Sequence, residues 1–205
     1  MAVSAPVSED GAVIEVRPGG RRRIDRVLAP DYIENLDQLG LEEVRARRDD
    51  SAQEETDLSY LRRLLHGRID IVRAEQRRRQ EGGSASVVEQ LATILADNAV
   101  GPAAGRGRYQ TVEPSRAEAH RRHVEALVSD ADLSDVTSLP DERLSLALRT
   151  YQAEEASVSQ RRREVQQVMD VLNAEIGARY RAGTASVDDL LAAERTRGDD
   201  SPQAG

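Results

Sequence analysis

The longest stretch without a helix breaker most constrains the fold of this chain. Residues 42–81 contain no proline, and Gly67 is their only glycine. Such a stretch predicts one uninterrupted α-helix of about 40 residues, roughly 60 Å long. Gly82 and Gly83 are expected to end it, and a second, short helix is predicted to follow, up to about residue 97.

The composition indicates the class of fold. Only 2% of the 205 residues are aromatic, with neither Phe nor Trp, while hydrophobic residues make up 39% and charged residues 32%. A β-sandwich or an α/β domain needs a thick core that such a chain cannot fill, whereas paired helices pack through Leu, Val, Ile and Ala. The sequence therefore predicts an elongated all-α protein.

The pattern of the first half returns in the second half at an offset of 100 residues, without a gap. Identical pairs occur along the long helix and continue into the short helix after it. We infer an internal duplication, in which each copy is a long helix followed by a short one. Among the pairs are Leu39 and Leu139, Glu42 and Glu142, Glu54 and Glu154, Ala74 and Ala174, Glu75 and Glu175, and Val87 and Val187.

The duplication also predicts the organisation of the chain. The charged stretch at 117–129 has the composition of a solvated helix. The run Arg21, Arg22, Arg23 near the N-terminus is either an incidental basic patch or a partner-binding arm. The expected segments are a disordered arm at 1–30, a first repeat at 31–97, a linker with the charged stretch at 98–130, a second repeat at 131–197, and a disordered tail at 198–205.

Apolar residues recur on one face of each long helix at the spacings of a coiled coil. Two copies of one unit are expected to pack about a pseudo-twofold axis through these faces. The predicted seam consists of Leu58, Leu61, Leu65, Ile69 and Val72 in the first helix and Val158, Val165, Met169, Leu172 and Ile176 in the second.

Beside each seam lies a stripe of polar residues at steps of four, three, four and four. Because an α-helix turns by about 100° per residue, five such side chains lie within roughly 80° of one another over about 22 Å. The first stripe is Glu55, Ser59, Arg62, His66 and Asp70, and the second is Glu155, Ser159, Arg162, Gln166 and Asp170.

One interpretation of these stripes is a solvated face with ion pairs, because charges at such spacings are common on helices. The duplication favours a ligand site instead. Neighbouring positions differ between the copies, as Tyr60 and Gln160 do, while four of the five stripe residues are the same. If the long helices pair antiparallel, the stripes would flank the joint and face one groove or two.

The chemistry of the stripes suits guanine nucleotides. Arg matches guanine O6 and N7, and a carboxylate accepts hydrogen bonds from guanine N1–H and the 2-amino group. Ser and Gln supply hydrogen bonds to phosphate or ribose. The chain contains no glycine-rich phosphate loop of the Walker or Rossmann kind. A helix-borne guanine site in two copies implies a ligand with two guanines, or two ligands.

The paired motifs resemble those of the RsiG family, anti-sigma factors of sporulating actinomycetes that use cyclic di-GMP to hold the sigma factor WhiG inactive. The motif Glu-x3-Ser-x2-Arg-x3-Gln-x3-Asp is complete from Glu155 to Asp170, and the first copy departs from it only at His66. The resemblance covers both long helices. It implies an antiparallel coiled-coil hairpin that binds two cyclic di-GMP molecules as a dimer and, when loaded, clamps a sigma factor of the WhiG type.

The resemblance also implies roles for the ten stripe residues. His66 can donate or accept a hydrogen bond as Gln does. Either its charge near neutral pH makes binding through the first motif pH-sensitive, or histidine is a tolerated substitution at this position. Glu55 and Glu155 belong to the implied ligand-binding set, and each either contacts the ligand or orients the neighbouring Arg without touching it. The other implied roles are guanine edges for Asp70 and Asp170, guanine or phosphate for Arg62 and Arg162, and further hydrogen bonds for Ser59, Ser159 and Gln166.

Several other classes of function are disfavoured. The net charge of −8 argues against sequence-independent DNA binding, which rests on neutralising phosphates. The absence of cysteine excludes disulfides and thiolate metal sites. The N-terminus has no apolar signal region and no stretch resembles a membrane span, so a cytoplasmic location is expected.

An enzyme is the least expected class. His120 and His123 are isolated from other potential ligands and are interpreted as surface histidines and not as a metal site. The two carboxylates of one stripe lie about 22 Å apart, too far for paired acid and base catalysis. The alternative to a nucleotide-dependent anti-sigma factor is a structural coiled-coil scaffold without a nucleotide ligand. The chain is expected to be monomeric before it binds its partner.

Overall fold

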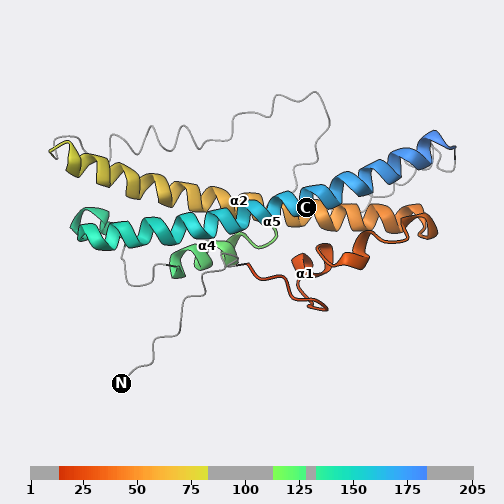
Figure 1. The fold of residues 1–205 in the computed structure, drawn as a ribbon, viewed down its shortest axis with the longest axis horizontal. Coiled ribbons are helices and arrows are strands. Elements are labelled where there is room, and N and C mark those ends of the chain that lie inside the picture. Colours follow the sequence, from red (N-terminus) through yellow and green to blue (C-terminus); the bar gives the residue numbers. More distant parts are fainter. Residues whose placement is uncertain (1–13, 83–112, 128–132, 184–205) are drawn as a thin grey trace, which may run out of the picture.

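The fold is an all-helical hairpin of two long helices with short helices along one side (Figure 1). The computed structural model describes residues 14–82, 113–127 and 133–183. The short helices predicted after each long helix, and the predicted tail at 198–205, lie outside the described residues. The described elements are α1 (Arg23–Val27), the 3-10 turns η1 (Pro30–Ile33) and η2 (Leu36–Gln38), α2 (Leu41–Gln80), α4 (Ala117–Ala126), η3 (Leu133–Ser138) and α5 (Asp141–Arg181).

The two predicted long helices are confirmed, and each begins and ends where the sequence favours it. Acidic residues occupy the first turn of both helices and arginines occupy the last turn, which complements the helix dipole. Pro140 directly precedes α5, where its fixed φ fits the start of a helix. Gly82 and Gly183 follow the last turns with φ of 83° and 70°, a conformation that glycine adopts without strain.

The long helices run antiparallel. Arg45, near the start of α2, donates a hydrogen bond to the hydroxyl of Tyr180, near the end of α5. At the other end of the hairpin, Arg79 of α2 forms an ion pair with Asp141 of α5 at 2.5 Å. The antiparallel coiled-coil hairpin implied by the sequence motifs is therefore confirmed.

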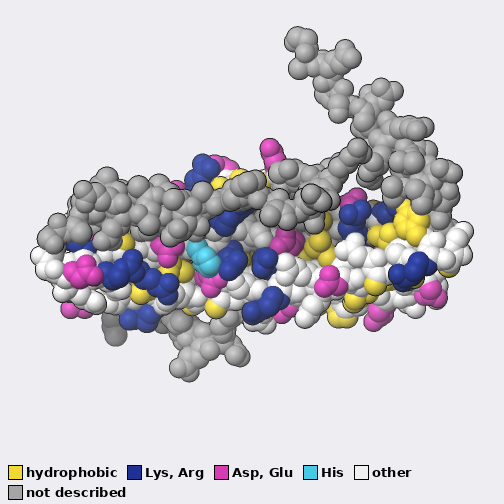
Figure 2. Space-filling model, turned by 90° about the horizontal axis from the view of Figure 1, so that it is seen from above, with side chains coloured by type: hydrophobic (Ala, Val, Ile, Leu, Met, Phe, Trp, Pro, Cys, Tyr) yellow, Lys and Arg dark blue, Asp and Glu magenta, His cyan; other side chains and the backbone are white. Residues whose placement is uncertain are grey.

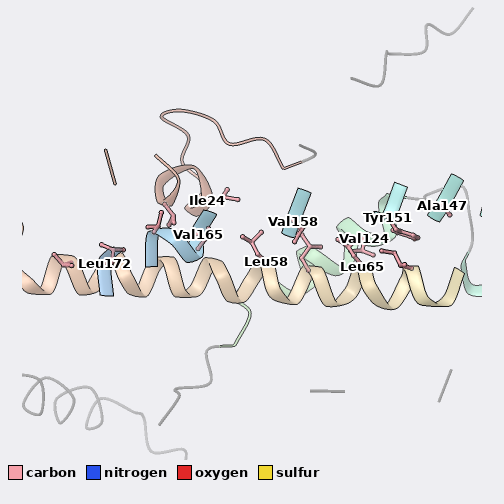
Figure 3. Close-up of a cluster of buried hydrophobic side chains, with 14 of the residues drawn as sticks. Ile24, Leu58, Leu65, Val124, Ala147, Tyr151, Val158, Val165 and Leu172 are labelled. Carbon is pink, nitrogen blue, oxygen red and sulfur yellow. The ribbon is translucent and has the colours of Figure 1, made fainter. Parts of the chain in front are cut away.

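The predicted seam forms the core between α2 and α5. All five seam residues of α2 are at most 5% exposed, and Val158, Val165 and Leu172 of α5 are fully buried. Met169 and Ile176 are only partly buried and pack against the edge of this core. The core extends beyond the predicted seam, because Tyr151 lies within it at 1% exposure (Figure 3).

The segment that precedes α2 differs from the expected disordered arm over residues 14–30. Ile24 and Val27, one helical turn apart in α1, are buried in the same core as the coiled-coil seam (Figure 3). Asp25, only 2% exposed, accepts hydrogen bonds from the Arg22 side chain at 2.6 and 2.8 Å and from the backbone N–H of Arg17. The apolar turn packs this short helix on the hairpin, and the hydrogen bonds of Asp25 order the segment internally.

The charged stretch in the linker is helical, as predicted, and most of its residues are exposed, but it is also docked on the hairpin through one buried side chain. Its helix α4 lies along the same side of the hairpin as α1 (Figure 1). Val124 is 2% exposed and enters the core beside Leu65 (Figure 3). None of the helices in the described ranges has a stretch long and apolar enough to cross a membrane.

Candidate functional site

The two polar stripes meet on one side of the joint between α2 and α5. Helical geometry places this side across the seam from α1 and α4. Figure 2 looks onto it and shows arginine, acidic and histidine side chains mixed along its middle. Hydrogen bonds connect eight of the ten stripe residues, which we call the polar cluster. They are Glu55, Ser59, Arg62, His66, Glu155, Ser159, Arg162 and Gln166.

Glu155 is the centre of one half of the polar cluster. Its Oε1 accepts hydrogen bonds from two residues of the other helix, Arg62 Nε at 3.1 Å and His66 Nε2 at 3.0 Å. It also accepts a hydrogen bond from the Ser159 hydroxyl, one turn along its own helix, at 2.7 Å. Glu155 therefore joins the first stripe to the second.

Glu55 is the centre of the other half and has the equivalent partners. Its Oε1 accepts hydrogen bonds from Arg162 Nε at 2.9 Å, from Gln166 Nε2 at 3.3 Å and from the Ser59 hydroxyl at 2.9 Å. His66 and Gln166 thus occupy corresponding places, each beside the glutamate of the opposite helix. The polar cluster has a pseudo-twofold axis that relates the two copies of the motif.

The polar cluster is partly sheltered from solvent. The side chains of Glu55 and Glu155 are each 22% exposed, and those of Arg62 and Arg162 are 38% and 28% exposed. Burial acts to raise the pKa of Glu155, but hydrogen bonds from Ser159, His66 and Arg62 outweigh it, so this pKa lies below its ordinary value. The carboxylate is therefore charged when it holds the arginine.

The two arginines of the polar cluster keep donor groups for a ligand. Each uses its Nε–H toward a glutamate, and neither Nη group of Arg62 or Arg162 donates a hydrogen bond to another described residue. An arginine that is fixed through Nε presents its Nη donors in a defined direction, which suits a phosphate or the O6 and N7 edge of guanine.

A comparison with known protein families identifies the family of this chain. A family model described as RsiG-like matches residues 30–95 and again residues 130–194, two regions that begin 100 positions apart and cover more than half of the chain. The chain belongs to the RsiG-like family. No match was found among curated proteins. Membership supports an anti-sigma role, with a sigma factor as the class of partner, in a family of regulators and not of enzymes.

The two remaining stripe residues of this RsiG-like chain continue the stripes beyond the eight residues of the polar cluster. Asp70 is half-buried and Asp170 is exposed. Each follows its His66 or Gln166 by four residues, about 6 Å along the helix. Because the helices are antiparallel, the two aspartates lie at opposite ends of the polar cluster.

A second group of charged residues lies on the other side of the RsiG-like hairpin, under α1 and α4. We call Glu54, Asp57 and Glu154 the acidic face, and each is at most 1% exposed. Sequence reasoning did not assign these residues a function. The identity of Glu54 and Glu154 at the offset of 100 is the signal that could have found these two, whereas Asp57 corresponds to Ser157 and carries no such signal.

The acidic face is covered mainly by basic residues of the short helices. Arg116, which precedes α4, donates to Glu54 at 2.5 Å and to Asp57 at 3.2 Å. Arg23 of α1 donates to Asp57 at 3.0 Å, and His123 of α4 lies 2.8 Å from Glu154 Oε1. His123 is exposed, as the sequence predicts, and its ring also contacts a buried carboxylate.

The pKa values of the acidic face reflect this balance of burial and pairing. Burial raises the pKa of Glu54 above its ordinary value despite the nearby Arg116 and Arg23. Burial acts in the same direction on Asp57, but hydrogen bonds from Ser115 and Arg116 outweigh it and lower the pKa.

A cavity of about 580 Å³ lies on this same side, lined by Tyr32, Arg47 and other residues, and is separate from the polar cluster.

Proposed function

We propose that this chain is an anti-sigma factor that binds cyclic di-GMP at the ten stripe residues and, when loaded, sequesters a sigma factor of the WhiG type. The observation that carries the proposal is the reciprocal pairing of Glu55 with Arg162 and of Glu155 with Arg62. It supplies two fixed arginines on one side of the hairpin. Family membership supports the anti-sigma part of the proposal.

The symmetry of the polar cluster supports a symmetric ligand. Cyclic di-GMP has two guanines and two phosphates related by a twofold axis, and two of its molecules can stack with a common axis. A pseudo-twofold arrangement of Arg62 and Arg162 offers equivalent donors to equivalent groups of such a ligand. We therefore expect two molecules bound as a dimer across the joint.

Charge compensation explains why each arginine is paired with a glutamate. Arg62 and Arg162 together balance Glu55 and Glu155, so the ligand-free cluster avoids uncompensated charge in a half-buried place. The ligand phosphates or guanine edges would accept from the Nη groups while Nε stays on the glutamate. In this proposal the glutamates contribute to the ten-residue site by positioning the arginines.

Asp70 and Asp170 complete the proposed site at its two ends. A carboxylate accepts the N1–H and 2-amino donors of guanine, and adenine presents no such pair on its base-pairing edge. Their positions beyond His66 and Gln166 would bring them to the outer guanines of a bound dimer. Selectivity for guanine would therefore depend on these two residues.

The regulatory step follows from linkage. If loaded and unloaded chains differ in affinity for the sigma factor, then the sigma factor must change the affinity for nucleotide by the same factor. A fall in cyclic di-GMP would release the sigma factor to transcribe its genes. We propose that the chain and the sigma factor both act in the cytoplasm. We also propose that the chain is monomeric before it binds this partner.

Calorimetric titration tests the ligand. Cyclic di-GMP is titrated into the isolated chain and then into a mixture with its sigma factor, with cyclic di-AMP as the matched control. We expect heat with cyclic di-GMP only, at two molecules per chain. Equal heats for both nucleotides would contradict guanine recognition, and no heat in either titration would favour the scaffold alternative.

Affinity capture tests the switch. Immobilised chain is incubated with the purified sigma factor, with and without cyclic di-GMP. We expect capture to rise with the nucleotide. Equal capture in both conditions would show that the chain and the sigma factor associate without a nucleotide switch.

The proposed organisation retains two repeats, at 31–97 and 131–197, as the nucleotide-binding unit. The remaining segments, 1–30, 98–130 and 198–205, are proposed to lie outside this unit. Deletion of residues 198–205 should therefore leave the calorimetric titration unchanged.

A further inference from the structure

The duplication extends to the short helices that precede the long ones. At the offset of 100, Arg23 and Ile24 of α1 correspond to His123 and Val124 of α4. Ile24 is 3% exposed and Val124 is 2% exposed, and both enter the same core (Figure 3). The basic residue before each of them faces a glutamate of its own repeat, Glu54 or Glu154. α1 and α4 are therefore two copies of one docking helix, and both lie outside the regions matched by the family model.

The two docking helices are not held equally. α1 buries three residues, Ile24, Asp25 and Val27, whereas α4 buries only Val124. α4 depends more on polar contacts, made by Arg116 and His123 with the acidic face. Such contacts are exchangeable, because another basic helix can supply them.

Glu154 is incompletely satisfied by its own docking helix. Its Oε1 is paired with His123, but its Oε2 is buried and accepts no hydrogen bond from a described residue. Histidine offers one N–H toward a carboxylate, whereas the planar fork of arginine offers two parallel donors, one for each oxygen. An arginine at the position of His123 could therefore pair with both oxygens of Glu154. The other copy, α1, has an arginine at this position, Arg23.

We propose that the surface under α4 is a binding site for an arginine-bearing helix of the sigma factor, which displaces α4 and pairs with both oxygens of Glu154. The matching helix carries arginine followed by a β-branched residue, as Arg23 and Ile24 do in α1. The buried carboxylates of the acidic face provide the charge complementarity. This inference rests on the proposed function for the identity of the partner, but the site itself does not depend on nucleotide binding.

A peptide experiment tests the site without the sigma factor. Two fluorescent peptides with the sequence of residues 113–127, one native and one with His123→Arg, are titrated into the full chain and followed by anisotropy. We expect the substituted peptide to bind about tenfold more tightly, because it adds one charged hydrogen bond to Glu154. Equal affinities, or no binding of either peptide, would overturn the exchangeable site and leave α4 as a fixed cover.

Variants of the full chain test the partner. His123→Arg should hold α4 in place and weaken sigma factor capture about tenfold, whereas His123→Ala should strengthen it. Arg122→Ala, at an exposed position of the same helix, is the matched control. Hydrogen exchange of residues 117–126 should slow in the first variant and accelerate in the second. Loss of capture in both variants would instead make α4 part of the surface that contacts the sigma factor.

The outcomes separate this inference from the proposed function. Cyclic di-GMP binding should be unchanged in both His123 variants, because the polar cluster lies on the other side of the hairpin. Failure of the unsubstituted chain to capture the sigma factor would contradict the proposed function and the identity of the partner. Capture by the unsubstituted chain and by His123→Arg to equal extents would contradict only the inference. A concentration-dependent dimer in sedimentation would assign the site to a second copy of the chain.

Discussion

Arg162 of α5 donates a hydrogen bond from Nε to the carboxylate of Glu55 on α2 over 2.9 Å. This bond crosses the joint of the hairpin, and its symmetric counterpart lies between Arg62 and Glu155. Each long helix thus supplies the carboxylate that orients the arginine of the other. Neither half of the site can be complete without the other half.

Arg162→Ala should lower the affinity for cyclic di-GMP about 10- to 100-fold, the effect expected when one or two charged hydrogen bonds are lost. The adjacent Arg163 is exposed, so Arg163→Ala is the matched control for charge and helix propensity. Calorimetry measures the affinities, and circular dichroism checks that helicity is intact. Undiminished binding by Arg162→Ala would show that the nucleotide lies elsewhere.

The pKa of Glu155 leads to a prediction about stability. Because this pKa is lowered in the folded chain, the charged carboxylate stabilises the fold above its ordinary pKa of 4.5, and this contribution is lost as the pH falls through the folded value. Glu155→Gln should therefore lower the free energy of unfolding by about 1–2 kcal/mol at pH 7. The difference from the native chain should vanish in acid. Urea unfolding at a series of pH values provides the measurement, and a constant difference would contradict the assignment.

The long helices and one face of each could be predicted because their causes are local. The absence of proline between Leu41 and Gln80 permits a single helix, and the spacing from Leu58 to Val72 gives the face that is buried. Spacing also places Glu55 on the same face as Arg62. These properties follow from helical geometry and need no knowledge of the partner helix.

The pairing across the joint could not be predicted, because the register between two helices is not contained in the spacing within either. The sequence gives no reason for Arg62 to meet Glu155 and not Asp170. The docking of α1 could not be predicted either, because five residues are too few for a periodic pattern. Its burial depends on Ile24 and Val27 reaching a core formed by helices that are distant in the sequence.

His66→Gln should make the two halves of the polar cluster equivalent. Gln166 donates from its amide Nε2 to Glu55 at 3.3 Å, and the amide introduced by His66→Gln could donate in the same way to Glu155. Affinity for cyclic di-GMP should therefore stay within about threefold of that of the native chain. Calorimetric titration measures this. A loss of about tenfold would show that the imidazole makes a contact that an amide cannot replace.

Leu65→Ala tests the core of the hairpin. Leu65 is fully buried between the helices, so its truncation should cost about 2–4 kcal/mol of stability through lost burial and the cavity left behind. Leu146 on α5 is 48% exposed and gives the matched control, Leu146→Ala, with an expected change near zero. Urea unfolding followed by circular dichroism compares the two. Similar losses would mean that the seam between α2 and α5 is not the main core.

The contact between His123 and Glu154 predicts a pH effect on α4. The hydrogen bond with Glu154 is the main cause that raises the pKa of His123 above its ordinary value of 6.5, and the carboxylate charge adds to it while burial opposes. A raised pKa stabilises the docked helix fully below 6.5 and ceases to do so as the pH rises through the folded value.

His123→Gln should therefore have a lower Tm than the native chain at pH 6, and the difference should shrink by pH 8.5. His120, whose pKa is lowered by burial and then by the charges of Arg116 and His123, titrates in the opposite sense. Because both proteins contain His120, its effect largely cancels in the comparison. A difference in Tm that stays constant from pH 6 to pH 8.5 would show that the proton on His123 does not hold α4 in place.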